Sequence, residues 1–355
     1  MNVGIIGASF AKAAYLPALR LIGGAQVVAL ASARMESARA AADQFSVPHV
    51  YDDWRRMLAE HTFDLVCIAT PTVTHAPMVL AALDAGAHVL AEKPTAMDAA
   101  EAQSMLDRAE ALGRLHMIDH ELRFNAKRRQ IKHLVDTGAV GNVRNVVINV
   151  IGSSYGDPAS RPEGDWWSSA EQGGGRLGAN GSHQVDLLRW WFGEISAVSG
   201  VVRTLVPDRL DRKTGRAWTA TADDHVQFNA EFDQGLLASV MISTIARHGA
   251  PQDTMICGSE GTIMLNNDTE RLLYAPAGEP LKEVDVPDPY QKLEGINGGI
   301  WNQSVVGVLT ELCGAIKEHR PLREGATFLD GLRNQRVLDA IRESDGLRRW
   351  VDVPA

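Results

Sequence analysis

The sequence predicts an α/β domain with a doubly wound parallel sheet, followed by an α+β domain with a largely antiparallel sheet. In the first third, short apolar runs such as residues 3–6 and 65–69 alternate with helical patterns. This alternation is typical of parallel strands covered on both faces. Residues 226–232 instead alternate apolar and polar side chains, as in a strand with one face in water. A chain of 355 residues suits two domains, and we expect them at 1–122 and 123–355.

In the first domain we expect strands near residues 3–6, 27–30, 65–69 and 88–90, joined by right-handed crossovers. One helix should begin after Thr74 and end at Gly86. The next should begin at a capping box formed by Asp98 and Glu101. Pro17 lies inside the expected first crossover helix, which predicts a kink or a helix restart there.

In the second domain the turn at residues 233–235 joins two apolar-rich runs, which predicts a hairpin. Residues 255–257 and 263–265 flank a second turn and predict another hairpin. Two helices should close the chain, one with an apolar stripe over residues 305–316 and one over about 327–344. The sequence therefore predicts an antiparallel sheet with helices on one face.

Composition disfavours several classes of partner. The formal net charge of −9 argues against nucleic acid and anionic membranes as partners. No apolar stretch approaches the roughly 20 residues of a membrane span, and the start of the chain lacks the basic segment of an export signal. Cys67, Cys257 and Cys313 are odd in number, and none pair at a metal-ligand spacing. We expect a protein of the reducing cytoplasm.

A glycine turn at the start of the chain predicts a dinucleotide site. The run 4–9, Gly-Ile-Ile-Gly-Ala-Ser, follows a predicted strand and precedes a helix, the position where backbone N–H groups meet a pyrophosphate. The full fingerprint has glycine at positions 7, 9 and about 12, whereas this chain has Gly7, Ser9 and Lys12. The hydroxyl of Ser9 can still donate to a phosphate, and Phe10 belongs to the same turn. A turn without a ligand is the alternative interpretation.

The end of the second predicted strand favours NADP, with NAD as the other possibility. Folds that prefer NAD usually carry an acid there, which bonds the ribose 2′-hydroxyl. Here the strand runs into Ser32, Ala33 and Arg34. A serine hydroxyl and a guanidinium can bind a 2′-phosphate, which a carboxylate would repel. In the alternative interpretation Arg34 belongs to an ordinary surface loop.

Two further loops follow predicted strands and should face the nicotinamide, because ligands bind beyond the carboxyl ends of such strands. The first is Thr70-Pro71-Thr72 with His75, and the second is Glu92-Lys93-Pro94. The predicted dinucleotide contacts are therefore Gly7, Ser9, Phe10, Ser32, Arg34, Thr70, Pro71, Thr72, His75, Glu92 and Lys93.

These motifs resemble those of the glucose–fructose oxidoreductase/inositol dehydrogenase/rhizopine-catabolism (Gfo/Idh/MocA) family. The resemblance includes the glycine turn, Glu92-Lys93-Pro94, the triple glycine 173–175 with Gly-Ser-His at 181–183, and residues 331–340 near the C-terminus. It spans nearly the whole chain. It implies a Rossmann domain, an antiparallel α/β domain, an active site in the cleft between them, and NAD(P)-linked hydride transfer at a carbinol or carbonyl of a sugar, inositol or related polyol.

The resemblance also implies the roles of two catalytic residues. The lysine that matches Lys93 bonds the reacting oxygen, and the histidine that matches His183 carries the proton, which suits a base that titrates near neutrality. The family pattern has aspartate four residues before this histidine, where this chain has Ala179. Asn180, Asp186 or Glu171 could substitute, and His183 could instead be structural.

Other residues complete the predicted substrate site. Arg123 lies at the domain junction and could reach the substrate or pair across the interface, and Trp166 could stack on a sugar ring or fill a core. The predicted substrate contacts are Lys93, Arg123, Trp166, Asn180 and His183. His116 and His120 have a helical ligand spacing but fall on a predicted strand and loop, so we expect no metal site.

The function predicted from these residues is an NAD(P)-dependent dehydrogenase or reductase that acts on the CH–OH group of a carbohydrate-like molecule. A second hypothesis is glycoside cleavage through transient oxidation and re-reduction by the cofactor. A third is a non-catalytic dinucleotide-binding sensor, which Ala179 favours and the presence of Lys93 and His183 disfavours. One-faced antiparallel sheets need cover, and in this family that face commonly packs on another subunit, so we expect a homodimer or homotetramer.

Overall fold

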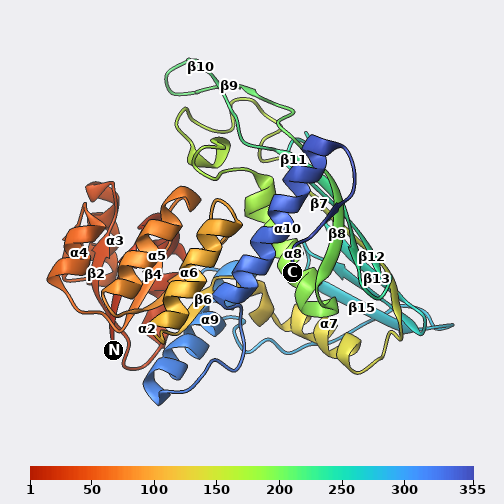
Figure 1. The fold of residues 1–355 in the computed structure, drawn as a ribbon, viewed down its shortest axis with the longest axis horizontal. Coiled ribbons are helices and arrows are strands. Elements are labelled where there is room, and N and C mark those ends of the chain that lie inside the picture. The colour runs from red at the N-terminus through yellow and green to blue at the C-terminus, as the bar shows by residue number, and fades with distance from the viewer. The chain divides into compact units, whose positions relative to one another are not determined.

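The computed structural model describes residues 1–355, which form two compact units (Figure 1). The first contains Met1–Asn125 and Asp288–Leu332, and the second contains Ala126–Pro287 and Arg333–Ala355. The first boundary lies three residues after the one expected from the sequence. The division differs in one respect: residues 288–332, which we had placed in the second domain, belong to the first unit.

The first unit has a six-stranded parallel sheet in the order β3-β2-β1-β4-β5-β6. This is the strand order of a Rossmann fold, and the predicted fold class is confirmed. The strands are β1 (Asn2–Ile6), β2 (Gln26–Ala31), β3 (His49–Tyr51), β4 (Leu65–Ile68), β5 (His88–Ala91) and β6 (His116–Ile118).

Helices cover both faces of this sheet and give it two apolar cores. One core includes residues of α2 (Tyr15–Leu21), α3 (Met35–Phe45) and α9 (Ile300–Glu318), and the other includes α5 (His75–Asp84) and α6 (Ala99–Ala111). Leu309 and Leu312 of α9 are fully buried in the first core, so α9 belongs to the first unit. The remaining elements of this unit are α1 (Ser9–Ala13), α4 (Trp54–Glu60), and the short 3-10 turns η1 (Thr72–Thr74) and η2 (Glu121–Phe124).

Two local predictions can be compared with the helices of this unit. The helix restart near Pro17 is present, because α1 ends at Ala13 and α2 begins at Tyr15. Pro17 therefore lies in a first turn, where its missing N–H has no helical partner to lose. Asp98 caps α6 by accepting a hydrogen bond from the N–H of Glu101 at 2.9 Å.

The second unit has a nine-stranded mixed sheet in the order β16-β15-β14-β13-β7-β12-β11-β8-β17. Both predicted hairpins are present, as β11–β12 and β13–β14. The one parallel pairing is between β7 and β12. The strands are β7 (Val143–Ile151), β8 (Ile195–Arg203), β11 (His225–Phe232), β12 (Leu237–Ser243), β13 (Asp253–Gly258), β14 (Gly261–Asn266), β15 (Arg271–Pro276), β16 (Lys282–Glu283) and β17 (Val351–Asp352).

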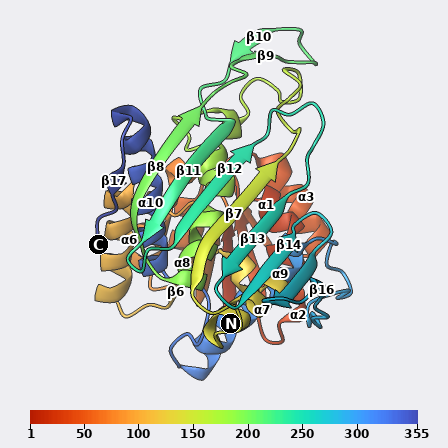
Figure 2. The same cartoon turned by 90° about the vertical axis from the view of Figure 1, so that its right-hand side faces the viewer.

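The helices of this unit lie on one face of the sheet, and the other face is uncovered (Figure 2). On the covered face, the Ser344 hydroxyl of α10 (Phe328–Leu347) accepts a hydrogen bond from the Gly200 N–H of β8 at 3.0 Å. The other elements are α7 (Ala126–Asp136), α8 (Ser182–Phe192), the 3-10 turn η3 (Trp166–Ser168), the π-helical turn η4 (Leu177–Gly181), and the small hairpin β9 (Asp208–Leu210) and β10 (Ala217–Thr219).

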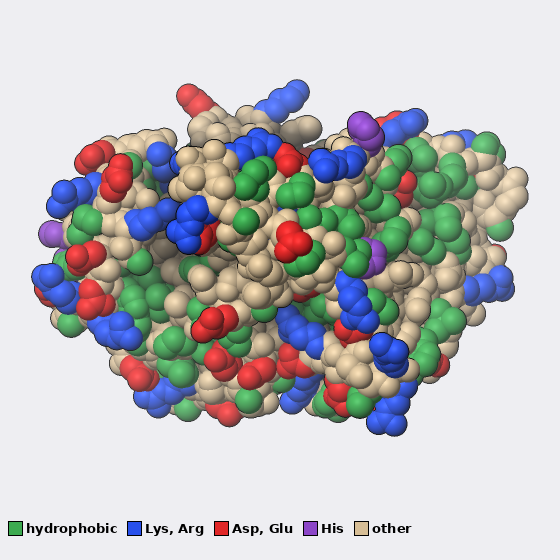
Figure 3. All heavy atoms as spheres, turned by 90° about the horizontal axis from the view of Figure 1, so that it is seen from above, with side chains coloured by type: hydrophobic (Ala, Val, Ile, Leu, Met, Phe, Trp, Pro, Cys, Tyr) green, Lys and Arg blue, Asp and Glu red, His purple; other side chains and the backbone are tan.

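The surface mixes charges of both signs. On the face drawn in Figure 3, Lys and Arg side chains are interspersed with Asp and Glu side chains. None of the helices combines the length and the apolar composition that crossing a bilayer requires.

Candidate active site

The glycine turn between β1 and α1 requires glycine at position 7. Gly7 has φ +106°, and a Cβ built there would lie 2.0 Å from the Ala69 carbonyl oxygen. The turn is also bonded to the end of β2, because the Gly7 N–H donates to the Ala31 carbonyl at 2.8 Å. Ser9, the first residue of α1, is exposed, and Phe10 is half-buried. Gly7 therefore lets the turn after β1 pack closely on the end of β4, which is the kind of tight turn found at dinucleotide sites.

The segment after β2 carries an unpaired cation. Ser32 is half-buried, and its N–H donates to the Tyr51 carbonyl at 3.0 Å. Arg34 is exposed at the start of α3, and its guanidinium makes no ion pair within the protein. Folds that prefer NAD carry an acid at the end of this strand. This chain has no acid there, and the exposed guanidinium of Arg34 lies three residues after the strand ends.

The loop after β4 is cross-linked by His75. Its two ring nitrogens lie 2.9 Å from the Thr70 carbonyl oxygen and 3.0 Å from the Pro94 carbonyl oxygen. Burial lowers the pKa of His75, so the neutral ring donates to one of these carbonyls at a time. Because His75 is fully buried, its link to a nucleotide is indirect: it joins the Thr70 loop to the Lys93 loop.

The other members of the Thr70 loop have distinct placements. Thr70 and Pro71 are half-buried, and Thr72 is buried. The Thr74 hydroxyl donates to the Pro71 carbonyl at 2.7 Å, and its oxygen lies 2.8 Å from the Thr70 hydroxyl. It does not cap α5, although that helix begins where the sequence predicted.

Lys93 follows β5 and is half-buried, between two buried neighbours. Its N–H donates to the Glu92 Oε2 atom at 3.2 Å, and the Lys93–Pro94 peptide bond is cis. The other oxygen of Glu92 is 2.9 Å from the Tyr15 hydroxyl, which also lies 2.9 Å from Asp119 Oδ2. The lysine is therefore attached to a buried cluster of two carboxyl groups and one phenol.

The buried carboxyl groups are electrostatically coupled. Burial raises the pKa of Asp119 well above its usual value, and the charges of Glu92 and Glu121 raise it further. Burial also raises the pKa of Glu92, against the charge of Lys93, which lowers it. Burial raises the pKa of Tyr15 well above its usual value, so the phenol is neutral.

Arg123 and His116 hold the first unit together. The Arg123 guanidinium donates to the Gly325 carbonyl at 3.1 Å and to Asp330 at 3.0 Å, and it is 7% exposed. Asp330 belongs to the same unit, so this pairing is not the cross-interface pairing considered from the sequence. His116 stacks on Phe328 with ring centroids 4.6 Å apart, and its Nδ1 accepts the Phe328 N–H at 3.0 Å.

His183 lies in the first turn of α8, directly after the π-helical turn η4. Such turns are rare and are frequent at functional sites. The chain enters through Gly175, with φ +111°, where a Cβ would lie 2.2 Å from Asp223 Oδ1. That carboxylate group also accepts the Leu177 N–H at 2.8 Å. Gly175 thus lets the half-buried Asp223 cap the segment that carries His183.

The three candidates for the missing aspartate have different surroundings. Glu171 is exposed in a turn before the glycines. Asn180 is half-buried and accepts from Arg176 Nη1 at 3.5 Å. Asp186 is 1% exposed and lies three residues after His183 on α8, so both side chains project from one face of the helix.

Trp166 is half-buried and stacks on Trp167 with ring centroids 3.9 Å apart. Next to this pair, the Arg176 guanidinium lies 5.4 Å from the Trp167 ring and donates to the Tyr155 hydroxyl at 2.8 Å. Sequence reasoning missed Arg176, although it precedes Asn180 by four residues, the spacing of neighbours on a helix.

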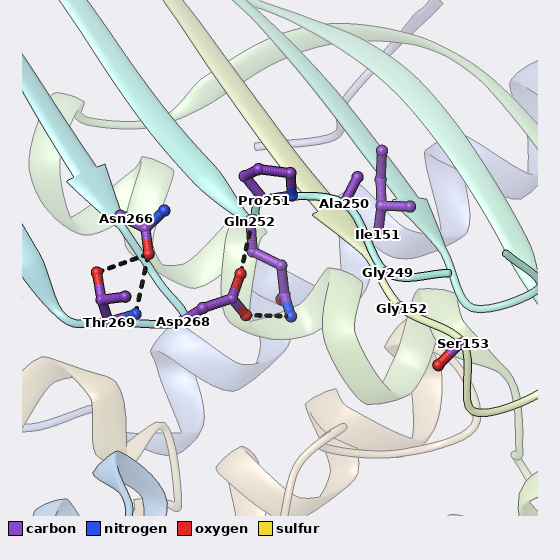
Figure 4. A pocket seen from close by; sticks show the side chains of 10 residues that line it. All are labelled: Ile151, Gly152, Ser153, Gly249, Ala250, Pro251, Gln252, Asn266, Asp268 and Thr269. Carbon is purple, nitrogen blue, oxygen red and sulfur yellow. Dashed lines mark hydrogen bonds between the residues drawn. The ribbon is translucent and has the colours of Figure 1, made fainter. Parts of the chain in front are cut away.

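A pocket of about 490 Å³ in the second unit contains none of these residues. Its polar groups pair with one another: Gln252 bonds Asp268 through its N–H at 3.0 Å and its amide at 2.9 Å, and Asn266 accepts from Thr269. Figure 4 shows these pairs around the opening. Because these polar groups already bond one another, few remain to bind a ligand, and the active site is not assigned to this pocket.

Two residues of the cluster beside Lys93 were not predicted as site residues. Asp119 directly follows the apolar strand β6, so the rule applied to the loops after β4 and β5 would have found it. Tyr15 gave no comparable signal, because one tyrosine in an apolar helix is most simply a core residue.

Comparison with known proteins agrees with this architecture. Residues 1–120 match the oxidoreductase family with an NAD-binding Rossmann fold, and residues 128–264 match the GFO/IDH/MocA C-terminal domain. The fold and both matches define a two-domain NAD(P)-dependent oxidoreductase. The chain belongs to the Gfo/Idh/MocA family, which confirms the family and the enzyme class predicted from the sequence.

Several relatives are sugar dehydrogenases. Levoglucosan dehydrogenase of Pseudarthrobacter phenanthrenivorans is 28% identical over 100% of this chain and 98% of its own length. D-apiose dehydrogenase of Paraburkholderia graminis is 28% identical over 74% of this chain and 67% of its own. A structure of levoglucosan dehydrogenase with NADH and L-sorbose has a TM-score of 0.89 at 27% identity, covering 100% of this chain and 99% of that one.

Proposed function

We propose that this protein transfers a hydride between a nicotinamide nucleotide and a secondary alcohol of a sugar or related polyol. The observation that carries the proposal is the pair of catalytic groups in a chain similar to sugar dehydrogenases over its full length. Lys93 follows β5 beside a buried carboxyl cluster, and His183 follows a π-helical turn.

In the oxidative direction, His183 accepts the hydroxyl proton as the hydride leaves the carbinol carbon. The Lys93 ammonium donates a hydrogen bond to the same oxygen and stabilises the developing alkoxide. We propose Asp186 as the acid that supports His183, because it is buried on the same helix face. Trp166 and Asn180 complete the proposed sugar contacts. Arg123, which the sequence also suggested, is left out because it is 7% exposed and bonds the Gly325 carbonyl and Asp330.

The nucleotide, when bound, supplies the hydride acceptor. The residues fit it at two places: the pyrophosphate would lie at the tight turn that Gly7 allows, and a ribose substituent would be held by Ser32 and Arg34. Thr70, Pro71, Ser9 and Phe10 line the proposed nucleotide site, and the buried Thr72, His75 and Glu92 support it from within.

Turnover of purified protein tests the function. We expect oxidation of one or more members of a panel of aldoses, anhydrosugars and inositols, followed by the absorbance of the reduced nicotinamide. A protein that binds nucleotide but oxidises nothing would indicate a sensor. Tightly held nucleotide that survives purification, with release of an aglycone from a glycoside, would indicate the glycoside-cleaving reaction instead.

We propose NADP as the preferred nucleotide. The support is the exposed, unpaired Arg34 and the lack of an acid at the end of β2. Arg34→Ala should weaken NADPH binding by about 1–3 kcal/mol and leave NADH binding unchanged. Arg39→Ala, an exposed arginine on the same helix, is the matched control. Wild-type protein that binds NADH as tightly as NADPH in a fluorescence titration would contradict the proposal.

We propose a homodimer or homotetramer that forms through the uncovered face of the nine-stranded sheet. The register places Val147, Met255, Met264 and Leu273 in one row across four strands, all half-buried and on that face. Met264→Glu should dissociate the assembly in sedimentation velocity. Leu210→Glu, at an exposed position on β9, should not. A wild-type monomer at all concentrations would contradict this.

We also propose the cytoplasm as the compartment. All three cysteines are unpaired, and Cys67 and Cys313 are buried, which suits a reducing environment.

A further inference from the structure

Tyr15, Glu92 and Asp119 form a cluster that the proposed reaction does not use directly. They come from three separate elements: Tyr15 begins α2, Glu92 follows β5 and Asp119 follows β6. Tyr15 and Asp119 are fully buried, and Glu92 is 9% exposed. The phenol oxygen is 2.9 Å from an oxygen of each carboxyl group.

These distances require an additional proton. A phenol has one proton to donate, and a carboxylate can only accept. If Tyr15 donates to one carboxylate, the other carboxyl group must itself carry a proton and donate it to the phenol oxygen. Otherwise two oxygen atoms would face each other at 2.9 Å without a hydrogen atom between them. Two buried carboxyl groups that share one phenol in this way do not both ionise.

The surrounding charges decide which group holds the proton. Asp119 faces Glu121, which is also buried, and the thiol of Cys67, whose pKa is raised by burial. Glu92 is the carboxyl group next to the Lys93 ammonium, whose charge favours the carboxylate form. Asp119 is therefore the protonated partner and Glu92 the ionised one.

We propose that Asp119 holds this proton permanently and that the resulting Glu92 carboxylate positions Lys93 and balances its charge. The two oxygens of Glu92 then have separate roles. One oxygen accepts a hydrogen bond from the Tyr15 hydroxyl, and the other accepts one from the backbone N–H of Lys93 at 3.2 Å. Phe10, in the helix after the glycine turn, packs edge-on against Tyr15 at 5.4 Å. The cluster thus links the nucleotide turn to the catalytic lysine.

The catalytic part of this inference rests on the proposed function. It is tested by replacing each of the two carboxyl partners of Tyr15 with the amide of the same shape. Asp119→Asn keeps a neutral donor in place, so kcat should stay within about threefold of wild type. Glu92→Gln removes the charge beside Lys93. It should lower kcat by about tenfold to a hundredfold and move the alkaline limb of the kcat/KM profile to lower pH. Glu110→Gln, at an exposed site on α6, controls for the loss of one negative charge.

The opposite pattern, or equal losses in the two amide variants, would overturn the positioning role. Nucleotide titration and circular dichroism identify a variant that fails to fold, and infrared spectroscopy tests the proton without any substrate. Wild-type protein at neutral pH should show the C=O stretch of a protonated carboxylic acid, with intensity that Asp119→Asn loses. Identical spectra for the two proteins would refute the proposal. If wild-type protein oxidises no sugar, the proposed function has failed, yet this comparison still decides whether Asp119 holds the proton.

Discussion

Lys93 follows a buried parallel strand, whereas His183 lies in the first turn of a helix that a π-helical turn introduces. The surroundings of Lys93 come from distant parts of the chain, because Tyr15 and Asp119 lie 77 and 27 residues from Glu92. The two residues discussed above as possible supports for His183, Asn180 and Asp186, each lie only three residues from it along the chain.

The acid content of the two regions also differs. Three buried carboxyl groups, those of Glu92, Asp119 and Glu121, lie close to one another near the lysine. The histidine region has Ala179 where the family has aspartate. The comparison suggests that charge at the lysine is fixed by a network, whereas charge at the histidine can be tuned by single substitutions on one helix.

The largest expected effect is loss of either of the two proposed catalytic groups. Lys93→Met and His183→Asn should each lower kcat by about a hundredfold or more, because each removes an interaction made in the transition state. Nucleotide affinity should change little. Lys213→Met and His133→Asn, at exposed sites, are the matched controls in steady-state assays. A Lys93→Met enzyme with normal turnover would reduce the lysine to a structural role.

An intermediate effect is expected from charges placed next to His183. Ala179→Asp restores a carboxylate one turn before it, which should move the acidic limb of the oxidative profile to higher pH by up to about one unit. Asp186→Asn should move that limb to lower pH and reduce kcat by about tenfold. The measurement is kcat/KM against pH for the wild type and for Ala179→Asp, Asp186→Asn and Asn180→Ala. If Asp186→Asn leaves the profile unchanged while Asn180→Ala alters it, Asn180 supports the histidine instead.

The same difference explains how far the sequence could predict the site. The strand order and the placement of the glycine turn, Thr70 and Lys93 follow from local patterns and from the rule for strand ends. The bonds of His75 and Arg123 do not, because their partners, Pro94 and Asp330, are set by packing between distant segments. For the same reason the packing of α9 against the first sheet could not be predicted: an apolar stripe shows that a helix is buried, but not against which sheet.

The smallest effect concerns stability, and its two causes, His116 and Asp119, lie in β6 and directly after it. Burial lowers the pKa of His116 to about 4, so between about pH 4 and 6.5 the unfolded chain binds the extra proton and stability falls as pH falls. Asp119, just after the same strand, has a raised pKa. Above about pH 4 the folded protein keeps a proton that the unfolded chain loses, and stability therefore falls as pH rises.

Thermal unfolding from pH 4 to 8 separates the two contributions. His116→Gln should flatten the dependence of Tm on pH below about 6.5, and Asp119→Asn should flatten it at higher pH, each by a few degrees, since about 1 kcal/mol moves Tm by roughly 2–4 °C at this size. The slopes, not the absolute Tm values, carry the result, because either substitution can also change packing. A wild-type slope that Asp119→Asn leaves intact above pH 6.5 would mean that Asp119 is ionised in the folded protein. The network at Lys93 would then need another source for its proton.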